Sequence, residues 1–201
     1  MTTLLQINAS IHGAHGNSTR LADQFVVNFR QAHPNAEVLR RDISGAEGVP
    51  HLTGERFAAF LTKPEERTME QRAVVAYSDT LIDELRRSDV IVLGLPMYNF
   101  GVPSQLKAYF DHIARAGVTF KYTATGPVGL LTGKKAYVFA ARGGLYAGTA
   151  LDTQTAYVRD FLRFVGITDV EFVYAEGLAM GEDRKQSALA GAQAKIDELA
   201  A

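Results

Sequence analysis

Apolar segments of strand length alternate along the chain with longer segments that repeat at the period of a helix. The two clearest strands are TLLQIN over residues 3–8 and DVIVLGLP over residues 89–96. The second is apolar on both faces, which is typical of a central strand in a parallel sheet. Three further segments also predict strands, namely EVLRRDI at 37–43, KKAYVFAAR at 134–142 and DVEFVYAEG at 169–177.

The segments between these strands predict helices with one buried face. Leu21, Phe25 and Phe29 are spaced by four residues, and Thr68 with Gln71 forms a capping box before a helix that ends near residue 88. Three more helices are expected around residues 103–113, 152–165 and 182–199. Residues 44–64 are rich in glycine and proline, and only GERFAAFL suggests a short helix there. This insertion is either a lid or dimer element, or a passive surface loop.

Five strands separated by helices predict an α/β fold, a doubly wound five-stranded parallel sheet with helices on both faces. The length of 201 residues fits one domain, which we expect to span residues 1–201. In such a sheet, ligands bind beyond the carboxyl ends of the strands at the switch point of the strand order. Functional residues are therefore expected in the loops that follow the strands.

Composition and charge exclude several classes of function. A formal net charge of −1 gives no reason to expect nucleic acid or an anionic membrane as a partner. The absence of cysteine excludes disulfides, thiol redox chemistry and cysteine-ligated metals. The start MTTLLQINAS does not have the pattern of a signal peptide, and the apolar run 90–97 is too short to span a membrane. We therefore expect a cytoplasmic protein.

The loop after the first strand, ASIHGAHGNSTRL, has the composition of an anion site. Its Ser10, Asn17, Ser18 and Thr19 bring polar groups to a helix N-terminus, and its Gly13 and Gly16 allow a ligand to approach the backbone. A phosphate is one interpretation, and a plain helix cap is the other. The loop is neither a P-loop nor a dinucleotide-binding turn, so a monophosphate is the simpler ligand.

Two further strand ends favour a flat ligand. The loop PMYNF supplies a thioether, two aromatic faces and an amide at Met97, Tyr98, Asn99 and Phe100, which suits a partly polar ring, although such side chains also plug the edge of a core. In the loop ARGG, two glycines expose backbone amides. Arg142 in that loop either compensates negative charge or simply pairs with an acidic side chain on the surface.

The histidines do not indicate a catalytic or metal site. His12 and His15 are three residues apart without further ligands, so no metal site is expected. His33, His51 and His112 are expected on the surface, and Asp111 with His112 cannot form a dyad on adjacent helix positions. There is also no Gly-x-Ser-x-Gly elbow of a serine hydrolase.

With these residues in view, the chain resembles the FMN-dependent NADH-azoreductases, which belong to the flavodoxin-like quinone reductases. The resemblance covers essentially the whole chain. It rests on the N-terminal serine loop, PMYNF, PSQLKAYFDHIARAGVTFKYTATGPVGLLTGKKA, ARGG and FLRFVGITDVEFVYAEG. It implies a flavodoxin-like fold and one non-covalent FMN per subunit.

The resemblance also implies roles for individual residues. The FMN phosphate and ribityl chain would be held by Ser10, Gly16, Asn17 and Ser18. The isoalloxazine would be lined by Met97, Tyr98, Asn99 and Phe100, and its pyrimidine edge would be contacted by Ala141, Arg142, Gly143 and Gly144. Family members often carry serine at the position of Ala141, so a side-chain hydroxyl bond is absent here.

A homodimer with two active sites at its interface is implied as well. Phe120 and Tyr122 would line the substrate pocket with Asn99 and Phe100, and Phe161 and Phe164 would reach in from the partner chain. For Phe120, Tyr122, Phe161 and Phe164, packing in the core is the alternative interpretation.

The implied activity is a ping-pong, two-electron reduction of quinones and aromatic azo compounds by NADH. Because the flavin carries this chemistry, no protein nucleophile or acid/base pair is needed. The preference for NADH over NADPH rests on the resemblance alone. Two other functions stay open, an FMN-binding electron carrier that needs a partner reductase, and a flavin-free regulatory or structural domain on the same fold.

Overall fold

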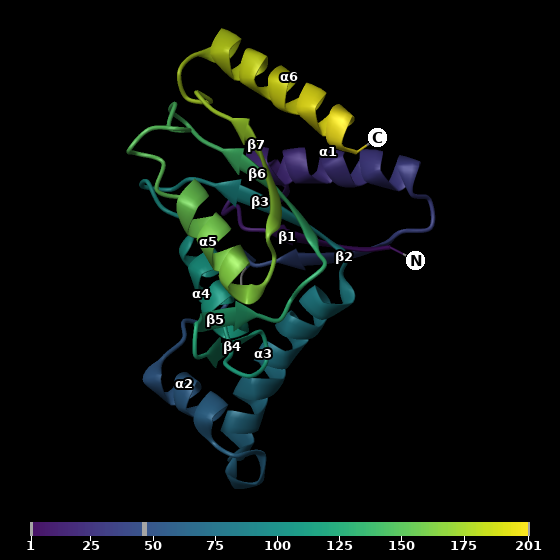
Figure 1. Cartoon of the computed structure of the whole chain (residues 1–201). Coiled ribbons are helices and arrows are strands. Elements are labelled where there is room, and N and C mark those ends of the chain that lie inside the picture. The colour runs from purple at the N-terminus through teal and green to yellow at the C-terminus, as the bar shows by residue number, and fades with distance from the viewer. Residues whose placement is uncertain (1, 46–47, 201) are drawn as a thin grey trace.

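Five parallel strands form the central sheet of the protein, shown here as a computed structural model that describes residues 2–45 and 48–200 (Figure 1). The strand order is β2-β1-β3-β6-β7, so the switch in direction lies between β1 and β3. The strands are β1 (Thr3–Asn8), β2 (Glu37–Asp42), β3 (Val90–Pro96), β6 (Lys135–Ala141) and β7 (Asp169–Ala175). All five predicted strands are confirmed, and so is the doubly wound parallel fold.

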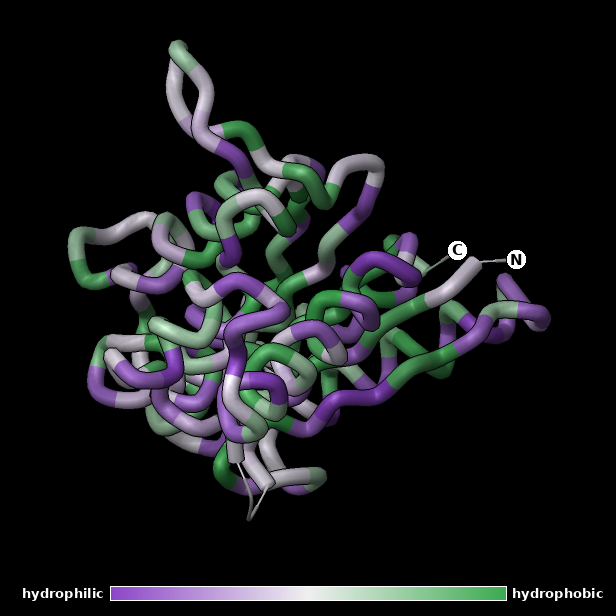
Figure 2. The backbone as a smooth tube through the Cα atoms, turned by 90° about the horizontal axis from the view of Figure 1, so that it is seen from below, coloured by the Kyte–Doolittle hydropathy of each residue, from purple (hydrophilic) through white to green (hydrophobic). Residues whose placement is uncertain are grey.

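Helices cover both faces of the sheet. On one face lie α1 (Asn17–Ala32) and α6 (Glu182–Leu199), with a core that includes Phe25 and Ile196. On the other face lie α3 (Met69–Arg87), α4 (Ser104–Ile113) and α5 (Thr155–Val165), with a larger core that includes Leu81 and Phe110. Polar and apolar segments alternate along the helices in Figure 2, as expected for helices that bury one side.

The central strand β3 shows why this sequence forms a two-sided sheet. Ile91, Leu93 and Leu95 belong to the core under α3, α4 and α5, whereas Val92 belongs to the core under α1 and α6. Side chains of a strand alternate between faces, so a strand that is apolar at consecutive positions needs cover on both. β3 pairs with β1 on one side and β6 on the other, which places it at the centre of the sheet.

A two-stranded antiparallel hairpin lies outside the main sheet and was not predicted. It consists of β4 (Phe120–Thr123) and β5 (Gly126–Gly129), and it packs against α5. The backbone amide of Leu131, just after β5, donates a hydrogen bond to the carbonyl of Val165 at the end of α5. This contact ties the hairpin to the helix side of the fold.

The insertion after β2 docks on the helices through a buried histidine. The predicted short helix is α2 (Gly54–Leu61), followed by the 3-10 turn η2 (Pro64–Glu66) and by the capping box of Thr68 at the start of α3. His112 of α4 is fully buried, its Nε2 lies 2.9 Å from the Pro50 carbonyl, and its ring packs edge-on against Tyr77. The prediction of a surface position for His112 was therefore wrong, because the insertion covers it.

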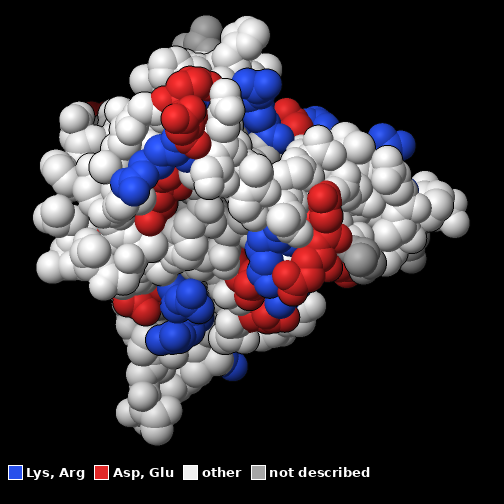
Figure 3. Space-filling model, turned by 90° about the horizontal axis from the view of Figure 1, so that it is seen from above, with Lys and Arg blue, Asp and Glu red and all other residues white. Residues whose placement is uncertain are grey.

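The surface carries both charge signs in mixture. Figure 3 shows Lys and Arg side chains next to Asp and Glu side chains on the face seen from above. Exposed ion pairs also lie along helices, and Lys195 with Glu198 in α6 is one of them. Among the described residues, no helix combines the length and the hydropathy that a membrane span requires.

Candidate functional site

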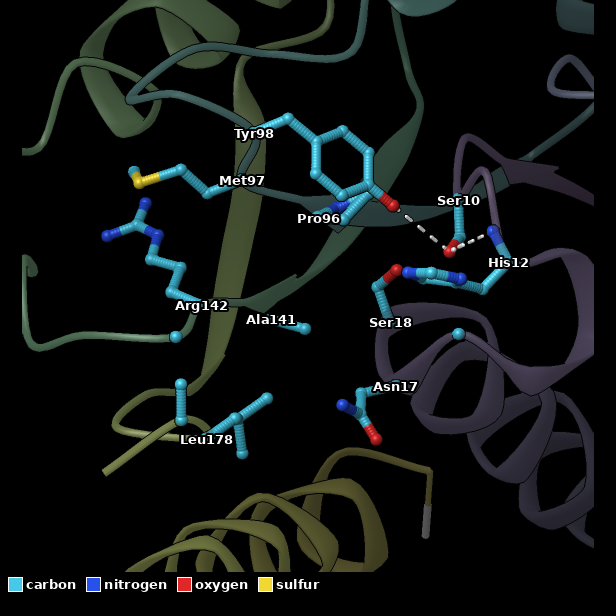
Figure 4. A pocket seen from close by; sticks show the side chains of 13 residues that line it. Ser10, His12, Asn17, Ser18, Pro96, Met97, Tyr98, Ala141, Arg142 and Leu178 are labelled. Atoms are coloured by element: carbon cyan, nitrogen blue, oxygen red, sulfur yellow. Dashed lines mark hydrogen bonds between the residues drawn. The ribbon is translucent and has the colours of Figure 1, made fainter. Parts of the chain in front are cut away.

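A cleft of about 250 Å³ opens at the carboxyl ends of the strands, at the switch point between β1 and β3 (Figure 4). This is where the fold class predicts a ligand site. Loops after four different strands and the start of α1 contribute to it. The lining residues are Ser10, His12, Gly16, Asn17, Ser18, Pro96, Met97, Tyr98, Ala141, Arg142, Gly143, Leu178 and Ala179.

One end of the cleft is built by the N-terminus of α1. The helix begins after Gly16 without a side-chain cap, so its first amides keep their hydrogen-bonding capacity for a ligand. The hydroxyl of Ser18 is buried and has no hydrogen-bond partner in the part of the chain that the structure describes. A buried polar group without a partner is costly, so this hydroxyl is a strong candidate for a ligand contact.

Two glycines allow α1 to approach the sheet so closely. A Cβ atom at Gly16 would lie 2.1 Å from the Ser10 hydroxyl oxygen, and a Cβ atom at Gly94 of β3 would lie 3.2 Å from the Ser18 carbonyl oxygen. Gly94 was not singled out in the sequence, because a lone glycine inside an apolar strand gives no local indication of a helix above it. Gly16 and Gly94 together allow the N-terminus of α1, the positive end of its dipole, to lie at the cleft.

Tyr98 connects the loop after β3 to the loop after β1. Its hydroxyl oxygen lies 3.4 Å from the Ser10 hydroxyl oxygen and accepts a hydrogen bond of 3.2 Å from the Ile11 amide. The Ser10 hydroxyl also accepts a bond from the His12 amide, as Figure 4 shows. The aromatic ring thus spans the switch point, and the two loops form one continuous wall of the cleft.

The loop after β3 is a tight turn with unusual backbone geometry. Tyr98 and Gly101 exchange two backbone hydrogen bonds, and the two residues between them, Asn99 and Phe100, have φ angles of 49° and 64°. This left-handed pair is the geometry of a type I′ turn, in which the second central position normally favours glycine. Phe100 is half exposed and packs edge-on against Tyr146 at a ring distance of 5.6 Å. Met97 and Tyr98 line the cleft, whereas Asn99 and Phe100, the next two residues of the predicted set, are not among its lining residues.

The loop after β6 offers free backbone amides. The carbonyls of Arg142, Gly143 and Gly144 accept hydrogen bonds from the amides of residues 177–179 in the loop after β7. The amides of Gly143 and Gly144 donate no hydrogen bond to any residue that the structure describes. The carbonyl bonds hold both residues in place. Gly143 lines the cleft, so its amide can reach a ligand there, whereas Gly144 is not among the lining residues. Ala141 lines the cleft through its methyl group, without a hydroxyl.

The side chain of Arg142 does not serve the cleft as an exposed cation. Its guanidinium is fully buried and pairs with Asp152 at 2.9 Å and with Glu176 at 3.1 Å. In Figure 4 it points away from Asn17 and Ser18. Of the two interpretations of Arg142, pairing with acidic side chains is the one observed. The acidic side chains are buried, however, and do not lie on the surface as expected. Arg142 is nevertheless one of the residues that line the cleft.

The ion pairs of Arg142 hold the carboxyl group of Asp152 in its charged form. Burial alone would raise the pKa of Asp152, but hydrogen bonds from Thr155 and Arg142 outweigh burial and lower it. Glu176 accepts hydrogen bonds from the amides of Tyr146 and Ala147 as well. The Arg142 side chain thus fixes the loop that leads from β6 to α5.

The four remaining aromatic residues of the predicted substrate pocket do not line the cleft of this chain. Phe120 is buried against Phe164 at a ring distance of 4.3 Å, and Phe161 stacks on Phe110 at 3.9 Å. Tyr122 is 74% exposed on the hairpin. Core packing therefore accounts for Phe120 within one chain, and a contribution of Phe161 or Phe164 to a partner's site stays a prediction.

Some lining residues were missed in the sequence. Leu178 and Ala179 come from the loop after β7, where no motif marks them, and Pro96 ends β3. His12 also lines the cleft, and its backbone amide donates a hydrogen bond to the Ser10 hydroxyl. It belongs to no motif that would have marked it in the sequence. Leu178 and Ala179 could have been found from their position, because they follow β7, and the loops after parallel strands meet at the same edge of the sheet.

The cleft fits FMN, the cofactor that the sequence resemblance implies. A phosphate matches the uncapped end of α1 and the unpartnered hydroxyl of Ser18. A planar ring matches the wall formed by Met97 and Tyr98, and its polar edge matches the free amide of Gly143. Among the described residues there is no group of three His, Asp or Glu side chains that could hold a metal ion.

Comparisons with known proteins agree with this geometry. The family described as having a flavodoxin-like fold matches residues 2–200. An FMN-dependent NADH:quinone oxidoreductase of Cellvibrio japonicus is 57% identical over 198 residues, which is 98% of each chain. FMN-dependent NADH:quinone oxidoreductase 6 of Burkholderia lata is 55% identical over 196 residues, again 98% of each chain.

Solved structures lead to the same group of proteins. The crystal structure of an azoreductase from Bacillus anthracis superposes with a TM-score of 0.90 at 30% identity and covers 100% of this chain and 99% of its own. An FMN-dependent NADH-azoreductase from the same species, crystallised in complex with FMN, has a TM-score of 0.89 at 28% identity, with coverages of 100% and 98%. With its sheet order, its switch-point cleft and these relatives, the chain belongs to the flavodoxin-like family of FMN-dependent NADH:quinone oxidoreductases.

Proposed function

We propose that this protein is an FMN-dependent oxidoreductase that uses NADH to reduce quinones and to cleave aromatic azo compounds reductively. One observation carries the proposal most directly. A buried, unpartnered Ser18 hydroxyl and an uncapped helix N-terminus face a cleft that is walled by an aromatic and a thioether side chain. Relatives with 55 to 57% identity carry the name FMN-dependent NADH:quinone oxidoreductase, which supports the same activity.

The chain supplies binding and orientation for the cofactor. The first amides of α1 and the Ser18 hydroxyl would hold the phosphate, with Ser10 and Asn17 beside them, and Gly16 would leave space for it. Met97 and Tyr98 support the ring from the loop after β3. FMN, when bound, would supply the redox chemistry, a two-electron transfer from NADH to the acceptor.

The glycine loop supplies the electrostatic part of the mechanism. Gly143 lines the cleft, its amide donates no hydrogen bond to a described residue, and its carbonyl accepts a hydrogen bond from the Ala179 amide, so this amide could donate to a ligand. Donors that are already in place stabilise negative charge without reorganisation, which is the largest catalytic contribution in many enzymes. The Gly143 amide would therefore stabilise negative charge on the edge of a ring that binds next to it.

The half-exposed rim of the cleft is where the acceptor enters. Phe100 is 50% exposed, and Ile11, Leu145 and Met180, each close in sequence to a lining residue, are exposed apolar side chains. Exposed apolar groups of this kind are typical of binding surfaces. They suit aromatic acceptors such as quinones and azo compounds, which enter after the nicotinamide leaves.

The same rim supports a homodimer in which a second copy covers the cleft. In that assembly, Phe161 and Phe164 of one chain contribute to the pocket of the other, with Tyr122 on the exposed hairpin nearby. The protein acts in the cytoplasm in this proposal. The insertion with α2 serves as part of the dimer contact or as a passive surface element.

An anaerobic titration tests the function. The purified, FMN-loaded protein is mixed with NADH and then with a benzoquinone or an azo dye while the visible flavin absorbance is followed. We expect full loss of the absorbance with NADH and rapid recovery with either acceptor, with parallel lines in double-reciprocal plots. If FMN binds but NADH leaves the absorbance unchanged, the protein is an electron carrier that needs a partner reductase. A protein that takes up no FMN would be a flavin-free domain on this fold.

A further inference from the structure

The turn that follows β3 is held in a conformation that its own residues disfavour. Asn99 and Phe100 both have positive φ angles, and a bulky residue such as phenylalanine rarely adopts this region. Strained backbone of this kind persists only where the surrounding structure determines it. The question is therefore which groups outside the turn keep Phe100 in place.

Gln154 makes the contacts that answer it. Its side-chain amide donates one hydrogen bond of 2.9 Å to the Pro96 carbonyl and another of 2.9 Å to the Gly101 carbonyl. The Pro96 carbonyl ends β3 and the Gly101 carbonyl ends the turn, so one side chain ties the end of the turn to the end of the strand. Gln154 is fully buried, and the neighbouring Thr153 donates a hydrogen bond from its hydroxyl to the Phe100 carbonyl.

The position of Gln154 is itself fixed by the Arg142 ion pairs. Gln154 immediately precedes α5, and the first turn of this helix is tied down where Asp152 accepts hydrogen bonds from the Thr155 amide and hydroxyl. Arg142 bonds to both Asp152 and Thr155. The donor group that reaches the turn therefore stands on a rigid support.

We propose that Gln154 is a positioning residue for the flavin ring, because its two hydrogen bonds hold the left-handed turn that begins at Tyr98, which lines the cleft. This inference rests on the proposed function. Gln154 is not among the residues that line the cleft, so it acts through the turn rather than by touching the cofactor. Thr153 supports the same turn from its exposed side.

Substitution of Gln154 by methionine removes both donors and keeps an unbranched side chain of similar length. The measurement is the dissociation constant of two probes, FMN and riboflavin, from quenching of flavin fluorescence. Riboflavin has the same ring and no phosphate. In Q154M we expect both dissociation constants to rise by the same factor, about tenfold, since each lost bond contributes modestly. The visible circular dichroism of bound FMN should change with them.

Two further variants separate the ring from the phosphate and from general stability. Ser18→Ala should weaken FMN by about tenfold and leave riboflavin within about twofold, because it removes a phosphate contact only. Ser78→Ala is the matched control, since it removes a buried hydrogen bond to the His112 carbonyl outside the cleft. It should lower the urea midpoint and leave both flavin affinities unchanged.

A second line of evidence uses the strain itself. Phe100→Gly places at the left-handed position a residue that adopts it without strain, so the turn then needs less support. In the F100G background the Q154M change should therefore raise the riboflavin dissociation constant by less than about threefold. Thr153→Val, at an exposed position that tolerates substitution, should give the Q154M pattern with a smaller factor of about threefold.

The outcomes distinguish this inference from the proposed function. If wild-type protein binds both flavins and Q154M and T153V bind them equally well, Gln154 does not position the ring and the inference is wrong, while the function stands. The inference is also wrong if Q154M weakens FMN alone, or if its effect is undiminished in the F100G background. Wild-type protein that binds neither flavin would overturn both.

Discussion

Replacing Arg142 by methionine is expected to destabilise the protein strongly, because the change leaves two carboxylates without their common partner. The guanidinium is fully buried, and Asp152 and Glu176 are 7% and 13% exposed at their side chains. The guanidinium also lies 5.1 Å from the ring of Tyr174. Methionine fills part of the volume but supplies neither charge nor donors.

The expected loss is about 3 kcal/mol in the free energy of unfolding. Removal of one partner of a buried ion pair costs about 3 to 5 kcal/mol. The lower end applies here because each carboxylate keeps other donors. Asp152 still accepts from the Thr155 amide and hydroxyl, and Glu176 still accepts from the amides of Tyr146 and Ala147.

Urea unfolding of the flavin-free protein measures this loss. With a urea dependence of about 2 kcal/mol per molar, the midpoint should fall by about 1.5 M. The matched control is Arg87→Met, which breaks an exposed ion pair with Glu37 and should cost less than about 1 kcal/mol. A loss below about 1 kcal/mol in R142M would contradict the assignment of Arg142 as the residue that holds this loop.

The pH dependence gives a second check with a defined sign. The pKa of Asp152 is lowered in the folded protein, so its contribution is present above the unfolded pKa of about 3.9 and is lost as the pH falls through the lower folded value. Without Arg142, Asp152 loses a hydrogen bond and a positive charge that lower its pKa, so its carboxyl group takes up a proton at a higher pH than in the wild type and the cost of burying its charge is relieved. The difference in the free energy of unfolding between wild type and R142M should therefore become smaller as the pH is lowered from 7 to about 4. A constant difference would refute the electrostatic explanation.

Three further predictions follow from single features. Gly16→Ala should abolish measurable FMN binding in a fluorescence titration, because its Cβ would overlap the Ser10 hydroxyl oxygen. Retained binding would contradict the placement of the phosphate at the N-terminus of α1. Thr68→Ala removes the capping box of α3 and should cost about 1 kcal/mol in urea unfolding, with flavin affinity unchanged. Burial lowers the pKa of His112, so the folded state binds fewer protons than the unfolded chain and stability should fall as the pH drops below about 6.5. His112→Asn should make the urea midpoint less dependent on pH below about 6.5. An unchanged slope would show that other groups cause the pH dependence.

The strands and helices were predictable because burial on two faces leaves a strong local pattern. Residues 3–8 and the helix 182–199 have the predicted bounds, and β3 differs by one residue. Helix α5 begins at Thr155 rather than near 152, because Asp152 accepts hydrogen bonds from the first turn instead of joining it. The hairpin of β4 and β5 was not predicted, since four-residue strands with polar exposed positions resemble loop sequence.

The candidate site was predictable as a place more readily than as a set of contacts. Each predicted loop follows a strand, and the topology alone brings the ends of parallel strands to one edge, so Ser10, Ser18, Met97 and Tyr98 meet there. What a side chain contacts depends on packing that residues far away in sequence decide. Arg142 illustrates this, because its partners lie 10 and 34 residues further along the chain.

The aromatic turn after β3 shows why an ordinary loop composition would not serve here. An Asn-Gly pair would adopt the left-handed turn without strain, but it would place no ring at the rim of the cleft. With Phe100 at the second position, the protein gains an aromatic face there, and the cost of the strained backbone is offset by hydrogen bonds from Thr153 and Gln154. The polar residues that stabilise this turn lie more than fifty positions away, at the start of α5. A departure from local turn preferences is thus an indication of function, and its supporting residues have to be sought in the structure.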